Sequence, residues 1–81
     1  MPHIIVKLYS GRSEEQKLDL VDSLTKVVSE KLNLNESSIS IAIEEFSREN
    51  WAKEVYKKDI IDNYEKLYKE PGYRPSENEF E

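Results

Sequence analysis

The 81-residue sequence contains no cysteine, which excludes disulfide bonds and metal sites built on thiolates. It also has no apolar run near the roughly 20 residues that a membrane-spanning helix needs. The N-terminus lacks the basic region followed by an apolar region that is typical of a signal peptide. We therefore expect a cytoplasmic protein that does not associate with membranes.

Positive charge is scarce as well. Twelve Lys and Arg residues stand against seventeen Asp and Glu residues, and the formal net charge is −5. Nucleic-acid binding needs a basic face, so this balance argues against a nucleic-acid partner. Ile, Leu and Val still recur in regular patterns, which indicates a folded domain with a charged surface rather than a disordered chain.

The short length limits how the chain can be stabilised. We expect residues 1–81 to form a single domain, with residues 73–81 as an extended or mobile tail. A domain of this size buries only about 60% of its unfolded surface, so it is marginally stable alone. Without disulfides, oligomerisation is the usual remedy.

The first half of the chain predicts a strand, a helix and a second strand. Branched apolar residues fill His3–Tyr9, the first predicted strand. Ser13 and Gln16 have the spacing of a capping box at the start of a helix that should run to about Leu32. Apolar residues alternate with polar ones over Ser38–Glu45, the second predicted strand.

The second half predicts one more helix. Its expected range is Ala52 to Lys69, after a polar connection over 46–51 and before the helix-breaking pair Pro71-Gly72. The fold class is thus α+β: a β-α-β protomer with an additional C-terminal helix. Two strands do not make a stable sheet by themselves, so we expect the sheet to be shared across a homodimer.

Pro2 is the most informative residue. Because a small residue follows the initiator Met1, the methionine should be removed, which leaves Pro2 with a free secondary amine. That amine can accept a proton, and it would lie at the start of a rigid strand. By itself, however, a proline at this position is usually just a residue that permits methionine removal.

Three stretches resemble the 4-oxalocrotonate tautomerase family. They are Pro2 after Met1, the run Gly11-Arg12-Ser13-Glu14-Glu15-Gln16-Lys17, and the run Ser38-Ile39-Ser40-Ile41-Ala42-Ile43-Glu44-Glu45. The later helix and Lys69-Glu70-Pro71-Gly72-Tyr73 resemble the longer-chain bacterial subgroup, in which the extra helix accompanies dimers. The resemblance implies a cofactor-independent isomerase that interconverts the keto and enol forms of a 2-oxo acid.

The resemblance also implies roles for individual residues. Pro2 matches the catalytic general base, Arg12 an arginine that holds a substrate carboxylate, and Trp51 an aromatic wall of the pocket. Ser40 stands where the hexameric members carry a second arginine. That departure favours a monoacid or an aryl-substituted 2-oxo acid over a dicarboxylate, unless Arg48 supplies the missing charge.

Each of these residues also has a purely structural interpretation. Arg12 could be a solvated surface residue, Trp51 could pack at an interface, and His3, the single histidine, could pack on its strand or tune the amine. The alternative function is a catalytically inactive, dimeric β-α-β interaction module, which the serine at position 40 favours. No metal site is expected.

Overall fold

The computed structural model describes all residues, 1–81, and divides into two compact units, residues 1–45 and 46–81. The first unit holds strand β1 (His3–Tyr9), helix α1 (Glu14–Leu32), a 3-10 turn η1 (Glu36–Ser38) and most of strand β2 (Ser40–Phe46). The second holds helix α2 (Arg48–Trp51), which continues into the π-helical stretch η2 (Ala52–Ile61), and two 3-10 turns, η3 (Tyr64–Lys66) and η4 (Glu77–Phe80). The predicted β-α-β order with an additional helix is confirmed.

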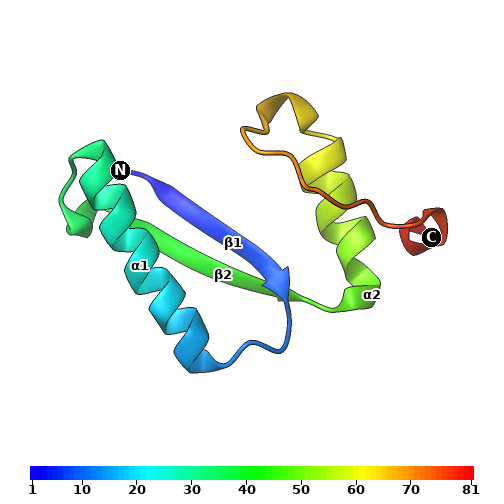
Figure 1. The fold of residues 1–81 in the computed structure, drawn as a ribbon, viewed down its shortest axis with the longest axis horizontal. Helices are drawn as coiled ribbons and strands as arrows, with labels where there is room; N and C mark the ends of the chain where they lie inside the picture. The colour runs from blue at the N-terminus through cyan, green and yellow to red at the C-terminus, as the bar shows by residue number, and fades with distance from the viewer. The chain divides into compact units, whose positions relative to one another are not determined.

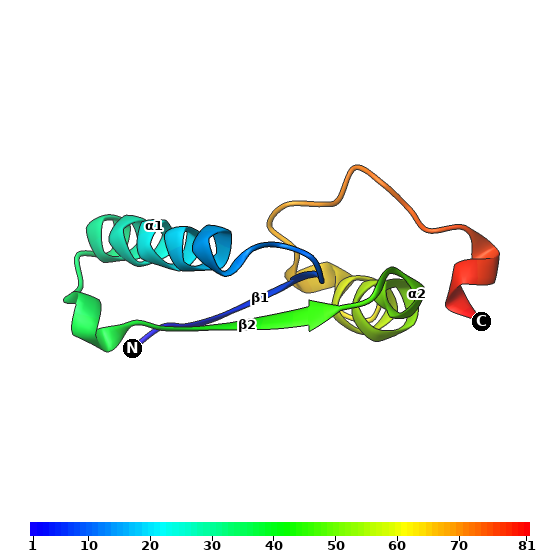
Figure 2. The same cartoon turned by 90° about the horizontal axis from the view of Figure 1, so that it is seen from below.

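The two strands of the first unit form a parallel pair. They are neighbours in one two-stranded sheet and run in the same direction (Figure 1). Helix α1 lies along one face of the pair, and no element of this unit lies on the other face (Figure 2). β1 has the predicted bounds, whereas β2 begins at Ser40 because residues 36–38 turn as a 3-10 helix.

Local signals set the bounds of α1. The Ser13 side chain accepts a hydrogen bond from the Gln16 N–H, and the Gln16 side chain accepts one from the Ser13 N–H, both at 3.1 Å. This confirms the predicted capping box, which satisfies two backbone donors that a helix start leaves unpaired. At the other end, Asn33 takes the left-handed conformation with φ 55° and closes the helix after Leu32.

The first unit has no fully buried residue. All side chains of α1, β1 and β2 within it remain at least partly exposed, and Ile5 on the uncovered face of β1 is 49% exposed. Exposed large apolar side chains on α1 add to this surface; they are Leu18, Leu20, Val27 and Leu32. A two-stranded sheet with one helix thus leaves much of its apolar surface in contact with solvent.

The predicted second helix is wrong at both ends. It begins at Arg48, because the Ser47 hydroxyl accepts a hydrogen bond from the Asn50 N–H at 3.2 Å and caps the first turn. It ends at Ile61, eight residues before the predicted end at Lys69. There the Asn63 side-chain amide donates to the Lys58 carbonyl at 2.8 Å and takes up an acceptor of the last turn.

The second unit has the only core of the chain. Ala52, Val55 and Tyr56 are 3%, 4% and 6% exposed, respectively. Tyr64 and Tyr68, which fall within the predicted helix range, are exposed. The last residues are extended to Ser76 and then form η4, so the chain end carries a helical turn.

No helix of the protein is both long and apolar enough to cross a membrane.

An ion pair fastens the start of α1 to the end of β2. The Lys17 ammonium lies 2.8 Å from a Glu45 carboxylate oxygen and 3.4 Å from one of Glu14. The hydrogen bond to Glu45 is the largest cause that raises the pKa of Lys17 above its ordinary value of 10.5. Burial opposes it, and the hydrogen bond to Glu14 and the charges of both carboxylates add to it. Lys17 therefore remains a cation throughout the physiological range.

We predict that Lys17→Met lowers the thermal unfolding midpoint more than Lys26→Met does. Lys26 is the matched control, since its 2.9 Å pair with Asp22 lies within one helix and joins no second element. A raised lysine pKa stabilises the folded state below the ordinary value of 10.5, and this contribution disappears as the pH rises through the raised value. Melting curves at one protein concentration should show a gap between wild type and Lys17→Met that closes at strongly alkaline pH. Equal effects of both substitutions would contradict this role for Lys17.

Candidate active site

Pro2 and Ser40 lie side by side where the two strands begin. The Ser40 backbone N–H donates to the Pro2 carbonyl oxygen over 3.2 Å. Pro2 is half-buried, whereas Met1 before it is 99% exposed. The strand pairing thus holds residue 2 in place and leaves Met1 fully accessible.

His3 and Ser40 form a side-chain pair at the same end of the sheet. His3 Nδ1 and Ser40 Oγ are 2.6 Å apart, and both side chains are exposed. A packing role for His3 is therefore wrong. Either the hydroxyl donates to a neutral ring nitrogen, or a protonated ring nitrogen donates to the hydroxyl. No sequence signal pointed to this pair, because 37 positions separate the residues and only the strand register brings them together.

Arg12 lies at the opposite end of β1 from Pro2. It follows Gly11, whose φ of 119° is a conformation that side chains other than glycine rarely adopt, and it precedes the helix cap Ser13. Arg12 is exposed, and no carboxylate of the chain pairs with it. The seven residues of β1 separate Arg12 from Pro2, which amounts to about 20 Å at the usual rise per strand residue. One protomer does not bring these two residues together.

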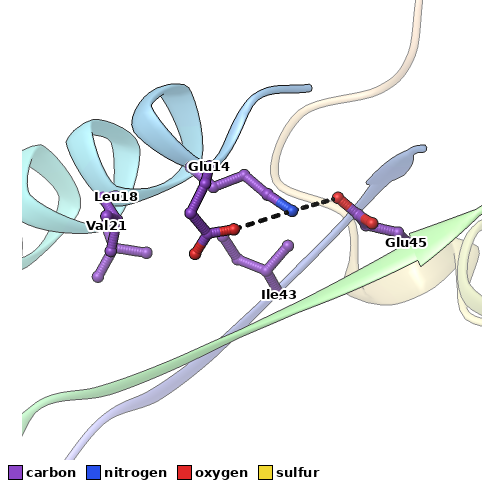
Figure 3. A pocket seen from close by; sticks show the side chains of 6 residues that line it. Glu14, Leu18, Val21, Ile43 and Glu45 are labelled. Carbon is purple, nitrogen blue, oxygen red and sulfur yellow. Dashed lines mark hydrogen bonds and ion pairs between the residues drawn. The ribbon is translucent and has the colours of Figure 1, made fainter. Parts of the chain in front are cut away.

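A hollow lies between the start of α1 and the end of β2. Its volume is about 330 Å³, and it is lined by Glu14, Lys17, Leu18, Val21, Ile43 and Glu45 (Figure 3). Its one cation, Lys17, is already paired with both carboxylates. The hollow therefore offers an anionic ligand no unpaired positive charge.

Trp51 ends the first turn of the helix in the second unit. Its ring meets Phe46 edge to face, with ring centres 6.3 Å apart. The indole Nε1–H donates to the Tyr73 hydroxyl oxygen at 2.7 Å. Arg48 begins the same helix and is exposed. Sequence reasoning missed Tyr73, because a tyrosine after Pro71-Gly72 carries no sign that it contacts a residue 22 positions earlier.

Comparisons with known proteins give one consistent result. A family model described as "Tautomerase enzyme" matches residues 2–59. A probable tautomerase of Xylella fastidiosa is 42% identical over 73 residues, which cover 90% of this chain and 89% of the relative. Tautomerase PptA of Cronobacter sakazakii is 39% identical over 74 residues, 90% and 97% of the two chains.

A solved structure is similar as well. The crystal structure of YwhB, a homologue of 4-oxalocrotonate tautomerase, superimposes with a TM-score of 0.61 at 35% sequence identity. The match covers 67% of this chain and 88% of YwhB. The similarity in fold therefore extends over most of the known structure.

Proposed function

Because this chain belongs to the tautomerase family, we propose that it is a cytoplasmic, cofactor-independent isomerase that interconverts the keto and enol forms of a 2-oxo acid. The observation that carries the proposal is the position of Pro2. Pro2 directly precedes β1, is half-buried, accepts a hydrogen bond from the Ser40 N–H, and follows a fully exposed Met1. Turnover of phenylenolpyruvate, followed by the loss of enol absorbance, tests the proposal.

The proposed general base is the secondary amine that methionine removal leaves on Pro2. A free α-amine titrates near 7.7–8.0, and burial or a nearby cation lowers that value toward the working pH. As the enol becomes the ketone, the amine takes the hydroxyl proton, and the ammonium so formed returns a proton to the carbon at the far end of the C=C bond, which regenerates the free amine. The C=C double bond becomes a single bond, and the C–O bond becomes C=O. A base with a pKa close to the ambient pH is the most effective for this transfer.

Ser40 and Trp51 are proposed to set the substrate class. Ser40 offers a neutral hydroxyl beside Pro2, where hexameric members of the family carry an arginine. A neutral group attracts a second carboxylate far less than a cation does, so a monoacid fits better than a dicarboxylate. The indole of Trp51 offers an apolar aromatic surface, which favours an aryl substituent on the substrate.

Arg12 is proposed to hold the substrate carboxylate from the other subunit of a homodimer. Two observations support a dimer. The strand pair leaves one face and two edges unpaired, and β1 separates Pro2 from Arg12 of the same chain by about 20 Å. A two-fold axis that joins two such sheets into four strands would pair an exposed edge of each sheet and bring Arg12 of the partner subunit to Pro2.

The rival function is an inactive dimeric interaction module. It rests on Ser40, because the family's second cation is missing there. The same absorbance assay separates the two functions, since a module that lacks catalysis leaves the enol to ketonise at its uncatalysed rate. Tautomerase relatives of nearly equal length make the enzyme the better-supported reading.

We predict that Pro2→Ala keeps the fold and loses much of the activity. The substitution replaces a rigid secondary amine by a primary amine with more freedom, so the base is still present but poorly placed. General-base catalysis contributes about 10²–10⁴-fold, and the loss in kcat/KM should fall within or below that range. Circular dichroism serves as the folding control, and an unchanged kcat/KM in Pro2→Ala would rule out the proline mechanism.

We predict that Arg12→Ala raises KM for a carboxylate-bearing enol more than it lowers stability. A hydrogen bond to a charged group contributes about 1.5–3 kcal/mol, which corresponds to roughly a 10- to 100-fold loss in binding. Arg12→Lys is the matched variant, because it keeps the charge but lacks the planar fork, and its KM should be intermediate. Wild-type kinetics in Arg12→Ala would show that Arg12 is only a surface residue.

We predict that the two impaired variants, Pro2→Ala and Arg12→Ala, complement each other when mixed. If Pro2 of one protomer works with Arg12 of the other, a mixed dimer of Pro2→Ala and Arg12→Ala chains carries one intact site. Joint refolding should restore activity above that of either variant refolded alone, with sedimentation and intact mass verifying mixed dimers. A stable folded monomer at micromolar concentration, or mixed dimers without restored activity, would contradict the shared site.

A further inference from the structure

We infer that Tyr73 is a positioning residue that fixes the indole of Trp51, so that the C-terminal segment 73–80 determines the preference for aryl-substituted substrates. The inference rests on the proposed function only where it concerns substrate preference. The positioning itself follows from contacts within the second unit. Its central contact is the 2.7 Å hydrogen bond from Trp51 Nε1–H to the Tyr73 hydroxyl oxygen.

Tyr73 is itself held by the most buried part of the protein. Its ring packs against that of Tyr56 with centres 5.4 Å apart and planes at 63°. The Tyr56 hydroxyl donates to the Tyr73 carbonyl oxygen at 3.0 Å. Since Tyr56 is 6% exposed and belongs to the core, Tyr73 is fixed through both its ring and its backbone. A hydroxyl held in this way can act as a fixed acceptor for the indole.

The end of the chain reinforces the same arrangement. The Phe80 ring also packs against Tyr56, with ring centres 6.1 Å apart. The Arg74 guanidinium lies 5.7 Å from the centre of the Phe80 ring. The Ser76–Glu79 capping box closes the turn that carries Phe80. The C-terminal segment therefore contacts the core residue Tyr56 at two points, through Tyr73 and through Phe80.

The hydrogen bond has a chemical consequence for Trp51. An indole has one hydrogen-bond donor and no acceptor. The bond to Tyr73 uses that donor and restrains the ring, so the indole presents its apolar surface rather than a polar N–H to a substrate. An aryl group gains from such a surface only in offset or edge-to-face geometry, which a freely rotating indole would not hold.

The test compares Tyr73→Phe with Tyr68→Phe. Tyr73→Phe removes the hydroxyl alone and keeps the ring on Tyr56 and the backbone bond. Tyr68 is the matched control, because it is 106% exposed. Trp51 is the only tryptophan, so intrinsic fluorescence reports on this indole directly. Tyr73→Phe should shift the emission maximum and lower the anisotropy, whereas Tyr68→Phe should leave both unchanged.

Kinetics supply the second measurement. In Tyr73→Phe, KM for phenylenolpyruvate should rise by about two- to tenfold, the range for one aromatic contact, with kcat nearly unchanged. KM for an enol with a methyl group in place of the phenyl should change little. In a Trp51→Phe background, Tyr73→Phe should have no further effect, because the hydroxyl acts through the indole.

Three outcomes overturn the inference: fluorescence of Tyr73→Phe identical to wild type, equal changes in KM for both enols, or a full further rise of KM in the Trp51→Phe background. The last result would mean that Tyr73 contacts the substrate itself. A wild type without turnover would instead refute the proposed function, and the fluorescence comparison would then decide whether Tyr73 fixes Trp51.

Discussion

The hydrogen bond between the Ser40 N–H and the Pro2 carbonyl is the interaction on which this account depends. It joins the residue just before β1 to the first residue of the parallel strand β2, and it holds the N-terminal proline on a sheet rather than on a free tail. An amine at residue 2 would otherwise move with a frayed chain end and could not be a well-placed base. The same pairing brings His3 Nδ1 to 2.6 Å from the Ser40 hydroxyl oxygen, so these two polar side chains lie at the same end of the sheet as Pro2.

The proposed site draws on more than one protomer. Arg12 lies past the far end of β1, and the first unit buries none of its residues completely. The proposed pairing of Arg12 with Pro2 and the exposed apolar surface both favour a second copy of the chain. If a two-fold partner supplies both, catalysis and stability depend on one interface, and a substitution that weakens the dimer would also separate Arg12 from Pro2.

Local sequence signals were sufficient for the first half of the fold. The Ser13–Gln16 capping box and the branched residues of 3–9 act over a few positions, so β1 and α1 could be predicted from pattern alone. The second helix could not, because its ends depend on side chains that compete for backbone groups, Ser47 at the start and Asn63 at the end. Periodic apolar residues continue past Asn63, but the helix does not.

Contacts between residues that lie far apart in the sequence could not be predicted from the sequence pattern. The His3–Ser40 pair depends on strand register, and the Trp51–Tyr73 bond depends on how the chain returns along its own helix after Pro71. Motif resemblance alone suggested the site residues Pro2, Arg12, Ser40 and Trp51. Such a resemblance carries no information about the distances between these residues in the fold. The structure adds that Ser40 neighbours Pro2 and that Arg12 of the same chain does not.

The measurement that tests the central claim most directly compares the protein with Met1 removed and the protein with Met1 retained, each verified by intact mass. With Met1 in place the Pro2 nitrogen is an amide, which cannot accept a proton near neutral pH. The proline mechanism predicts that only the trimmed form ketonises phenylenolpyruvate, with a rate that rises with pH through the titration of the amine. Equal turnover by the two forms would contradict it.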